Sequence, residues 1–390
     1  MIYYLMLIFL CSFCLFDFYN KKKIIFVSFI LLILFAGLRY RIGYDWYPYQ
    51  QFADNVESFS ELLNYKNSNF NNYSFEIGYK YLNVLNKTAG GNYETLVFIY
   101  VVFDMLCLSF FLKKMKIKNR NFFLLLYYVN LFYNFEFGQI RQGIAFHLFM
   151  VAVVYYNHKK YFRYILFSFV GFLFHYTIIL PFFSIFIVSK IKVTKNKVIL
   201  LIFILILFNI FQLELTKKFF QLIYNYLPDF YKYRLNYYMV RYNGRSIGMV
   251  FYEKIFLGII VMIFYKRLKK RKNNEVFFKL FFLELLISVI FIEYHIFTSR
   301  FRAYFQYGLI FIYSQIPQKI EKDFIIIIFL FFYSTLVMTY RLLPQENQVL
   351  FFPYKNYIIE KYIKGNIDES KRESVKRWKK ALEIVGDDEK

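Results

Sequence analysis

The stretch Leu38 to Tyr49, which reads L-R-Y-R-I-G-Y-D-W-Y-P-Y, gathers residues that could do chemistry in one place. Arg39, Arg41 and Asp45 follow directly on the apolar run 24–38, where a membrane helix would meet water. Tyrosines are common at such a boundary as headgroup anchors. Ionisable groups are rare at membrane depth, because burying their charge is costly, and two arginines with a carboxylate against the end of one span are more charge than a simple anchor carries. The stretch therefore predicts a polar, aromatic-lined opening at a membrane surface.

Arginine recurs at the ends of other apolar runs, at Arg141, Arg300 and Arg302. Its planar guanidinium makes paired, charge-assisted hydrogen bonds to phosphate, so arginines brought together on one side of a membrane favour a polyanionic substrate. The alternative is that these arginines only pair with acidic residues near the same ends. Those acids are Glu76, Glu136 and Glu293.

Two acidic residues, Asp104 and Glu284, stand in the middle of apolar runs. Such residues can carry protons in a transporter, or they can hold helices together by hydrogen bonds. His147 also lies in an apolar run, where a histidine is more often a packed residue than a ligand. The sequence leaves these alternatives open.

The composition is typical of an integral membrane protein. Of the 390 residues, 59% are hydrophobic and 24% aromatic, and apolar runs of about 15 to 20 residues recur along the chain. The net charge of +24 would suggest a nucleic-acid partner in a soluble chain, but the lysines and arginines collect in short loops between apolar runs. This is the positive-inside pattern of cytoplasmic loops, so no nucleic-acid partner is expected.

With these basic loops inside, the sequence predicts an all-α, polytopic membrane bundle of about twelve spans, some of them short or re-entrant. Both ends of the chain then lie outside. The predicted spans are 2–16, 24–38, 95–112, 121–137, 140–156, 163–175, 177–189, 198–212, 249–265, 276–293, 303–316 and 324–340.

The region 164–190 has the apolar length of one crossing, but one crossing would export the lysines of 190–197. Two short spans that meet near His175, Tyr176 and Pro181 keep all basic loops inside. A bend at that depth should line a wet cavity, because irregular backbone is not tolerated in contact with lipid.

We expect a transmembrane domain at 1–345, with outer loops at about 39–94 and 213–248. The segment 213–248 is Tyr-rich and amphipathic, as in a helix that lies on the membrane surface. The remainder, 346–390, is expected to be an interfacial segment followed by a charged helix and tail with no apolar face.

Motifs of soluble catalysts are missing from the sequence: there is no Walker loop, G-x-G-x-x-G, H-E-x-x-H or G-x-S-x-G. The histidines have no metal-ligand spacing, so no metal and no cofactor are expected.

The ordered set of motifs resembles the EpsG family of Wzy-type polysaccharide polymerases over about residues 24–355. The Leu38 stretch is followed by F-E-I-G-Y-K-Y-L-N at 75–83, I-R-Q-G-I-A at 140–145, F-H-Y at 174–176, S-R-F-R-A-Y-F at 299–305 and P-Y at 353–354. The charged tail after about Gly365 lies outside the resemblance.

The resemblance implies an enzyme of the bacterial cytoplasmic (inner) membrane whose active site faces outward. It would polymerise undecaprenyl-pyrophosphate-linked oligosaccharide units into O antigen, capsule or exopolysaccharide. The lipid pyrophosphate would be the leaving group and a sugar hydroxyl the nucleophile. The resemblance also implies a partner protein that regulates chain length. A lipid-linked oligosaccharide flippase and an O-antigen ligase remain alternatives.

For this chemistry we expect Arg39, Arg141 and Arg300 to hold the pyrophosphate, since they match the family pattern and stand at separate helix ends. Arg41 and Arg302 are second choices. The general base that activates the acceptor hydroxyl could be His175, Asp45 or Glu76. Tyr49 and Trp46 are expected to contact the substrate, because sugar rings stack on aromatic faces, and Gln142 is expected to contact it as well.

Overall fold

The computed structural model describes residues 1–19, 24–64, 69–212, 214–226, 228–229, 232, 235–236, 239, 249–269 and 274–385. Every named element in these ranges is a helix, which confirms the all-α class. Every predicted span overlaps a helix. Part of the predicted surface segment 213–248, including 240–248, lies outside the described residues, as do the last residues of the predicted tail.

The helices form two units, residues 1–176 with 317–390, and residues 177–316. The first unit contains α1 (Ile2–Phe16), α2 (Ile24–Gly37), α3 (Trp46–Asn55), α4 (Phe59–Asn64), α5 (Asn69–Asn72), α6 (Ile77–Thr88), α7 (Tyr93–Lys114), α8 (Arg120–Tyr127), α9 (Tyr133–Glu136), α10 (Ile140–Asn157), α11 (Tyr161–Phe174), α19 (Ile320–Leu342), α20 (Gln345–Phe351) and α21 (Ile367–Val385). The second contains α12 (Ile179–Ser189), α13 (Lys195–Ile210), α14 (Leu215–Tyr224), α16 (Met249–Lys269), α17 (Asn274–Ile290) and α18 (His295–Ser314).

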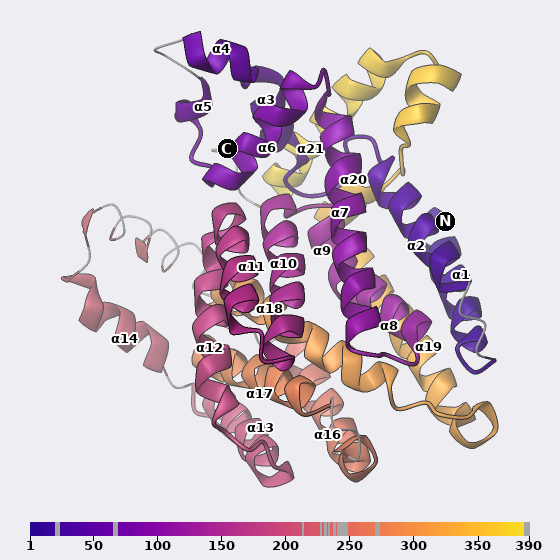
Figure 1. The fold of residues 1–390 in the computed structure, drawn as a ribbon, viewed down its shortest axis with the longest axis vertical. Coiled ribbons are helices and arrows are strands. Elements are labelled where there is room, and N and C mark those ends of the chain that lie inside the picture. The colour runs from indigo at the N-terminus through magenta and orange to yellow at the C-terminus, as the bar shows by residue number, and fades with distance from the viewer. Residues whose placement is uncertain are drawn as a thin grey trace. The chain divides into compact units, whose positions relative to one another are not determined.

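Helix α10 is the centre of the first unit. It is apolar on all sides and almost wholly buried, as expected for a helix surrounded by others. Helices α7 and α11 run beside it (Figure 1). The short helices α3 to α6 gather at one end of these three, the end at which α10 begins (Figure 1). The structure thus brings the predicted polar opening next to Arg141.

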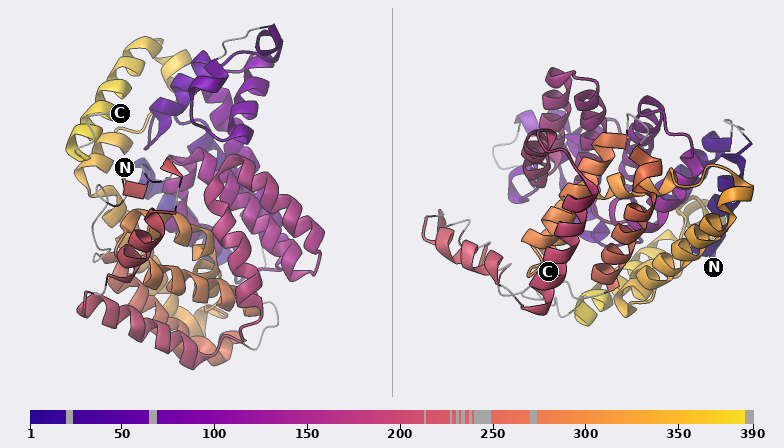
Figure 2. Two further views of the ribbon diagram at one scale, coloured as in Figure 1. Left: turned by 90° about the vertical axis from the view of Figure 1, so that its left-hand side faces the viewer. Right: turned by 90° about the horizontal axis from the view of Figure 1, so that it is seen from below.

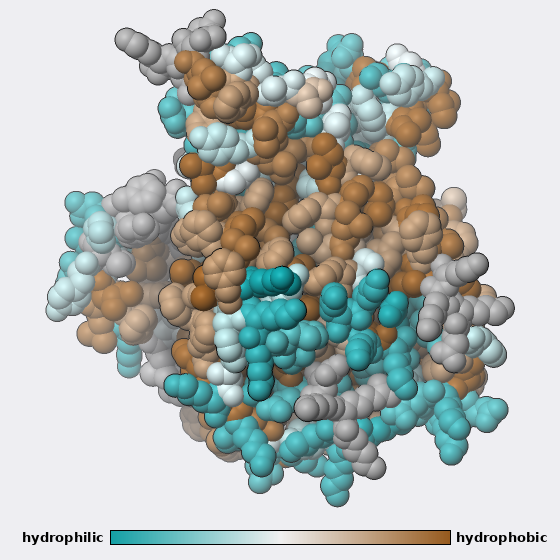
Figure 3. Space-filling view, in the orientation of Figure 1, coloured by the Kyte–Doolittle hydropathy of each residue, from teal (hydrophilic) through white to brown (hydrophobic). Residues whose placement is uncertain are grey.

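The apolar helices suit a membrane. Helices α7 and α19 are long and apolar enough to cross one, and α1, α2, α11 and the stretch Tyr176–Ser189 are shorter apolar helices. Large apolar side chains stay exposed on these elements, for example Phe26, Phe162 and Ile325. In Figure 3 an apolar surface covers the middle of the first unit, and hydrophilic residues gather at the end of α7 and α10 away from α3 to α6. Such an exposed apolar surface is expected to contact lipid.

A break separates α11 from α12, as predicted. Helix α11 ends at Phe174, and His175 has extended backbone angles, φ −158° and ψ 119°. A short 3-10 turn at Tyr176–Ile178 leads into α12. Whether the two helices cross the membrane separately stays a prediction.

The second unit has its own core, built from α13, α16 and α17. Leu205, Phe251, Val289 and Ile292 pack together there. Glu293 accepts hydrogen bonds from the backbone N–H groups of Thr216 and Lys217, both at 2.9 Å, and so caps the N-terminus of α14. Exposed Phe219 and Leu222 give this helix an apolar face that fits the predicted membrane surface.

The prediction that the charged tail has no apolar face is wrong. Helix α21 buries Ser370, Ser374, Trp378 and Ala381, which recur every three or four residues and therefore share one face. Helix α21 packs against α20 (Figure 2), and Trp378 of the buried face contacts Tyr44 of the polar opening. The buried positions are mostly small residues, so hydropathy alone did not reveal them.

Candidate functional site

The segment Leu38–Asp45 is held by the C-terminal part of the chain. Tyr40 N donates to Lys355 O at 2.9 Å and Tyr357 N donates to Leu38 O at 2.8 Å, which makes Arg39 and Asn356 an isolated antiparallel bridge. On the other side, Tyr44 N donates to Phe137 O at 3.2 Å. The segment is therefore fixed between residues 350–357 and the loop that joins α9 to α10.

Gly43 makes this path possible. Its φ is +106°, a conformation that side chains disfavour, and a Cβ built there would lie 1.7 Å from Phe137 O. Only glycine lets the two backbones approach so closely.

Arg39 is buried under the segment, with 3% of its surface exposed. Its guanidinium donates to Ala36 O at 2.8 Å and to the Tyr100 hydroxyl, and it lies 5.1 Å from the centre of the Phe137 ring. The Tyr100 hydroxyl in turn donates to Glu136 O at 2.9 Å. Arg39 therefore ties α2 to α7 and α9.

Arg41 lies beside the same segment, in the left-handed conformation with φ 51°. Its Nε is 3.5 Å from Glu94 Oε1, at the start of α7. Its guanidinium stacks on Tyr40 and on Trp46, 4.9 and 5.9 Å from the ring centres. Trp46, predicted to contact the substrate, is thus buried against an arginine.

Arg141 is the second residue of α10 and forms the centre of a polar cluster. Its guanidinium pairs with Glu76, the N-cap residue of α6, and its Nε donates to the Tyr49 hydroxyl at 3.3 Å. It lies 4.7 Å from the centre of the Phe75 ring. The Arg141 side chain is 21% exposed and that of Glu76 7%, so Arg141 is the member of the pair that solvent reaches.

The tyrosines of the opening stay protonated at neutral pH. Burial raises the pKa of Tyr49, although the neighbouring Arg141 guanidinium acts in the opposite direction. Burial likewise raises the pKa of Tyr44 to about 12. Both side chains are therefore neutral, and Tyr49 can accept a hydrogen bond from Arg141 while it keeps its own proton.

The other predicted residues of the first unit lie at the same end of the helices. Gly78 in α6 packs against the backbone carbonyl of Leu173, two residues before His175, which is half-buried. Asp45 is exposed at the N-cap position of α3. Gln142 is buried beside Arg141 in sequence. The structure therefore brings the three general-base candidates to the end where Arg141 lies.

A protein-family model, that of the EpsG family, matches residues 22–356, which is most of the chain and includes all of these residues. The chain belongs to the EpsG family. This family is linked to exopolysaccharide biosynthesis and consists of membrane proteins. A search of curated proteins gave no match, and a search of solved structures gave none either.

Helix α21 lies beyond the part that matches the EpsG family, yet it contacts the opening. Trp378 Nε1 donates to Tyr44 O at 3.0 Å, and the Trp378 ring centre lies 4.7 Å from that of Tyr47. Arg377 donates to Phe352 O at 2.8 Å. The helix thus supports the polar opening from outside the family region.

The second unit of this EpsG-family chain contains two arginines that were predicted to bind pyrophosphate. They are Arg300 and Arg302, in the N-terminal part of α18. Arg302 lies 3.9 Å from Glu284 Oε1, so the acid noticed in α17 has a cationic neighbour. Arg300 is half-buried. Its predicted meeting with Arg39 and Arg141 joins two units and stays a prediction.

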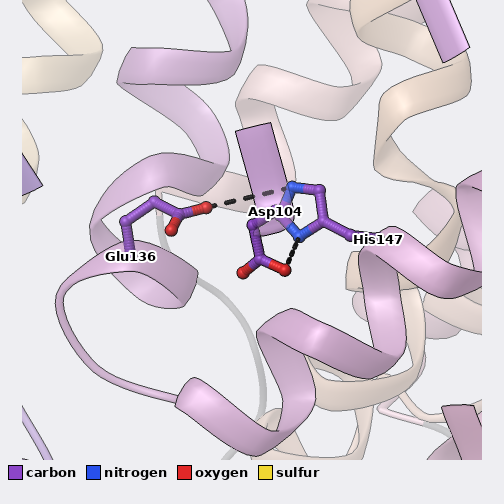
Figure 4. Close-up of side chains that lie close together, drawn as sticks. All are labelled: Asp104, Glu136 and His147. Carbon is purple, nitrogen blue, oxygen red and sulfur yellow. Dashed lines mark ion pairs between the residues drawn. The ribbon is translucent and has the colours of Figure 1, made fainter. Parts of the chain in front are cut away.

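Sequence reasoning missed one cluster. Asp104, Glu136 and His147 come from α7, α9 and α10, are fully buried, and point toward one another (Figure 4). Among the described residues they are the one group whose side chains could hold a metal ion. The signal was a lone acid and a lone histidine in separate apolar runs; nothing in their spacing shows that they meet.

Proposed function

We propose that this protein polymerises polyprenyl-pyrophosphate-linked oligosaccharide units into a surface polysaccharide, on the outer face of the bacterial cytoplasmic membrane. The growing glycan leaves its lipid pyrophosphate and bonds through its anomeric carbon to a sugar hydroxyl of the next unit. The proton of that hydroxyl goes to a protein base and the bonding electrons of the broken bond go to the pyrophosphate. Membership of the EpsG family supports this class of reaction.

The observation that carries the proposal is the position of Arg141. It stands in the first turn of α10, where the helix dipole favours an anion. Glu76, Tyr49 and Phe75 hold the guanidinium in place, and part of it remains accessible to solvent. A preorganised cation of this kind stabilises the charge that develops on a departing pyrophosphate.

The buried arginines play a different part in this proposal. Arg39 and Arg41 use their guanidiniums on protein groups, so they hold the opening in shape and add positive potential to it. Arg300 and Arg302 would complete the pyrophosphate site from the second unit. Glu76, Asp45 and His175 are the candidates for the base, and Asp45 is the one that is exposed.

The proposed orientation follows from the basic loops. The loops after α7 and α10 carry Lys113, Lys114, Lys116, Lys159 and Lys160, and they lie at the ends of these helices opposite Arg141. With these lysines inside, the Arg141 end faces outward. The proposal includes about twelve crossings, a lipid-linked glycan as substrate and a protein partner that sets chain length.

The test replaces Arg141 by Ala or Lys in a strain that lacks its own copy of the gene, with membrane level measured for each variant. We expect Arg141→Ala to reduce long-chain polysaccharide by at least about 100-fold, the range seen when one charge-stabilising donor is removed. Single repeat units should accumulate on the outer leaflet. Arg141→Lys should show a smaller loss, since lysine keeps the charge but not the paired hydrogen bonds.

Arg163→Ala is the matched control. Arg163 also stacks on a tyrosine, 5.4 Å from the Tyr155 ring centre, but lies at the opposite end of α11 from His175. Arg163→Ala should leave the distribution of polysaccharide chain lengths unchanged. If Arg141→Ala is present in the membrane at the wild-type level and still gives the normal distribution of chain lengths, Arg141 does not have the proposed role. Accumulation on the inner leaflet would indicate a flippase, and long free chains that are not joined to their final acceptor would indicate a ligase.

A further inference from the structure

The buried cluster below the polar opening is short of positive charge. Asp104, Glu136 and His147 are each 0% exposed, so water does not stabilise their charges. His147 Nδ1 lies 3.3 Å from Asp104 Oδ1, and its Nε2 lies 3.8 Å from Glu136 Oε1. Two carboxylates thus share one imidazole, which carries at most one positive charge.

Other buried acids of this chain are compensated. Seven carboxylates are buried among the described residues. Five of them contact a cationic side chain or two backbone N–H groups: Glu76 with Arg141, Glu284 with Arg302, Glu360 with Lys364, Glu293 with Thr216 and Lys217, and Asp323 with Gln318 and Lys319. Within the described part of the chain, no lysine or arginine pairs with Asp104 or Glu136.

Hydrogen bonding does not make up the difference. The Tyr127 hydroxyl lies 2.8 Å from Glu136 Oε1 and 3.0 Å from His147 Nε2. Both oxygens of Asp104 and Oε2 of Glu136 have no hydrogen-bond partner among the described residues. A buried carboxylate with unused oxygens is costly, so the cluster must take up either protons or a further cation.

We propose that Asp104, Glu136 and His147 bind one divalent transition-metal ion between α7, α9 and α10. The charge of the ion would neutralise the two carboxylates and leave the imidazole neutral. This proposal stands on the cluster alone and does not depend on the proposed polymerase activity.

The histidine is prepared for such a ligand. Its Nδ1 lies 2.8 Å from the backbone carbonyl of Gly143, which accepts a hydrogen bond from Nδ1–H in the tautomer that leaves the lone pair on Nε2. Glu136 already faces Nε2 (Figure 4). Asp104 faces Nδ1 and must rotate toward the ion, which its unbonded oxygens allow.

The distances require only a small adjustment. With one nitrogen of the imidazole, either Nδ1 or Nε2, the three residues offer atoms that lie within 4.8 Å of one another. Metal bonds of about 2.1 Å place ligand atoms roughly 3 to 4 Å apart, a range that the 3.8 Å between His147 Nε2 and Glu136 Oε1 already meets and that Asp104 reaches by its rotation. Two carboxylates with one imidazole suit Mn²⁺, Fe²⁺ or Zn²⁺ better than Mg²⁺ or Ca²⁺, which prefer oxygen alone.

Bound metal would connect to the opening through Glu136. The backbone carbonyl of this residue accepts a hydrogen bond from Tyr100, which holds Arg39. An ion that fixes α9 against α7 and α10 therefore also fixes the support of Arg39. The metal site would be structural, below the surface at which the glycan reacts.

The experiment measures metal in the purified full-length protein in detergent. Wild type is dialysed against Mn²⁺, Fe²⁺ (without oxygen) or Zn²⁺, washed, and analysed by inductively coupled plasma mass spectrometry. We expect about one equivalent of one of these metals, and a higher unfolding temperature with that metal than with EDTA. His147→Gln and Asp104→Asn/Glu136→Gln should each retain less than a tenth of the wild-type metal.

His158→Gln is the matched control, because His158 makes the same type of Nδ1 contact, 2.7 Å to Val154 O, away from these acids. It should bind metal like wild type. The neutral double variant also guards against misfolding, since removing two uncompensated charges should leave the metal-free protein at least as stable. Wild type that takes up none of the three metals, with an unfolding temperature equal to that of the double variant, would overturn the proposal and show that the acids bind protons.

Discussion

Two polar clusters along the first half of α10 solve the problem of buried charge in different ways. At Arg141 a carboxylate and a guanidinium from two helices neutralise each other, and the arginine keeps part of its surface in solvent. Around His147 two carboxylates meet one imidazole in complete burial. The first arrangement suits an exchangeable anionic substrate, because a cation is exposed at a surface. The second suits a permanently held cation, because the acids are enclosed.

The largest expected loss of stability comes from replacing Gly43, which lies between the two clusters. Gly43 touches Phe137 O, one residue after Glu136, and its segment carries Arg41. Gly43→Ala should destabilise the fold by about 3 kcal/mol or more, from a strained φ and a direct clash. Folded protein recovered from membranes, and its unfolding temperature, would measure this.

Gly90→Ala measures the cost of a positive φ without a steric clash, and so separates the two contributions expected at Gly43. Gly90 also has a positive φ, +77°, but a Cβ there would meet nothing within 4 Å. We expect a loss of about 1 kcal/mol. Equal losses at the two positions would mean that the contact between Gly43 and Phe137 is not as close as described.

One substitution in each cluster, compared for its free energy of unfolding, should give an effect of intermediate size. Glu76→Gln leaves Arg141 without its carboxylate and should cost about 2 kcal/mol, the range for losing a hydrogen bond to a charged group. Glu136→Gln, in chelator-treated protein, should cost nothing, because it leaves Asp104 as the one carboxylate beside the His147 imidazole. Chemical unfolding of both variants in detergent would measure the difference. Similar losses in the two would show that Glu136 is compensated after all.

The smallest effect concerns the helix that supports the opening. Lys355 Nζ lies 2.6 Å from Glu373 Oε2, and this hydrogen bond lowers the pKa of Glu373 below its usual 4.5. The stabilisation is therefore present above pH 4.5 and is lost as the pH falls through the lowered pKa. Because Glu373 is half exposed, we expect less than about 1 kcal/mol.

Unfolding temperatures at pH 7 and pH 4 would measure this small effect. Glu373→Gln should be less stable than wild type at pH 7, and the difference should shrink at pH 4. Glu369→Gln, on the exposed face of α21, is the control and should behave like wild type at both values. A difference for Glu373→Gln that grows toward acid would contradict the assignment.

Much of the architecture was predictable because hydrophobic length is a local property. Apolar runs bounded by lysines gave the helix positions, and the motifs around Leu38, Ile140 and Ser299 gave the family. The break after Phe174 was also predicted, from the charge of the following loop. The buried face of α21 was not, because two of its four buried residues are serines and charged residues surround them in the sequence.

The sequence by itself determined that this is a helical, apolar chain with basic loops between its apolar runs and arginines at their ends, because composition and spacing fix these properties locally. Only the tertiary structure decided which charges meet. It gave Arg141 the partner Glu76, placed Arg39 in the interior, and brought Asp104, Glu136 and His147 together from three helices. The physical reason is that a pair's energy depends on distance and burial, and both are set by packing between residues far apart in the chain.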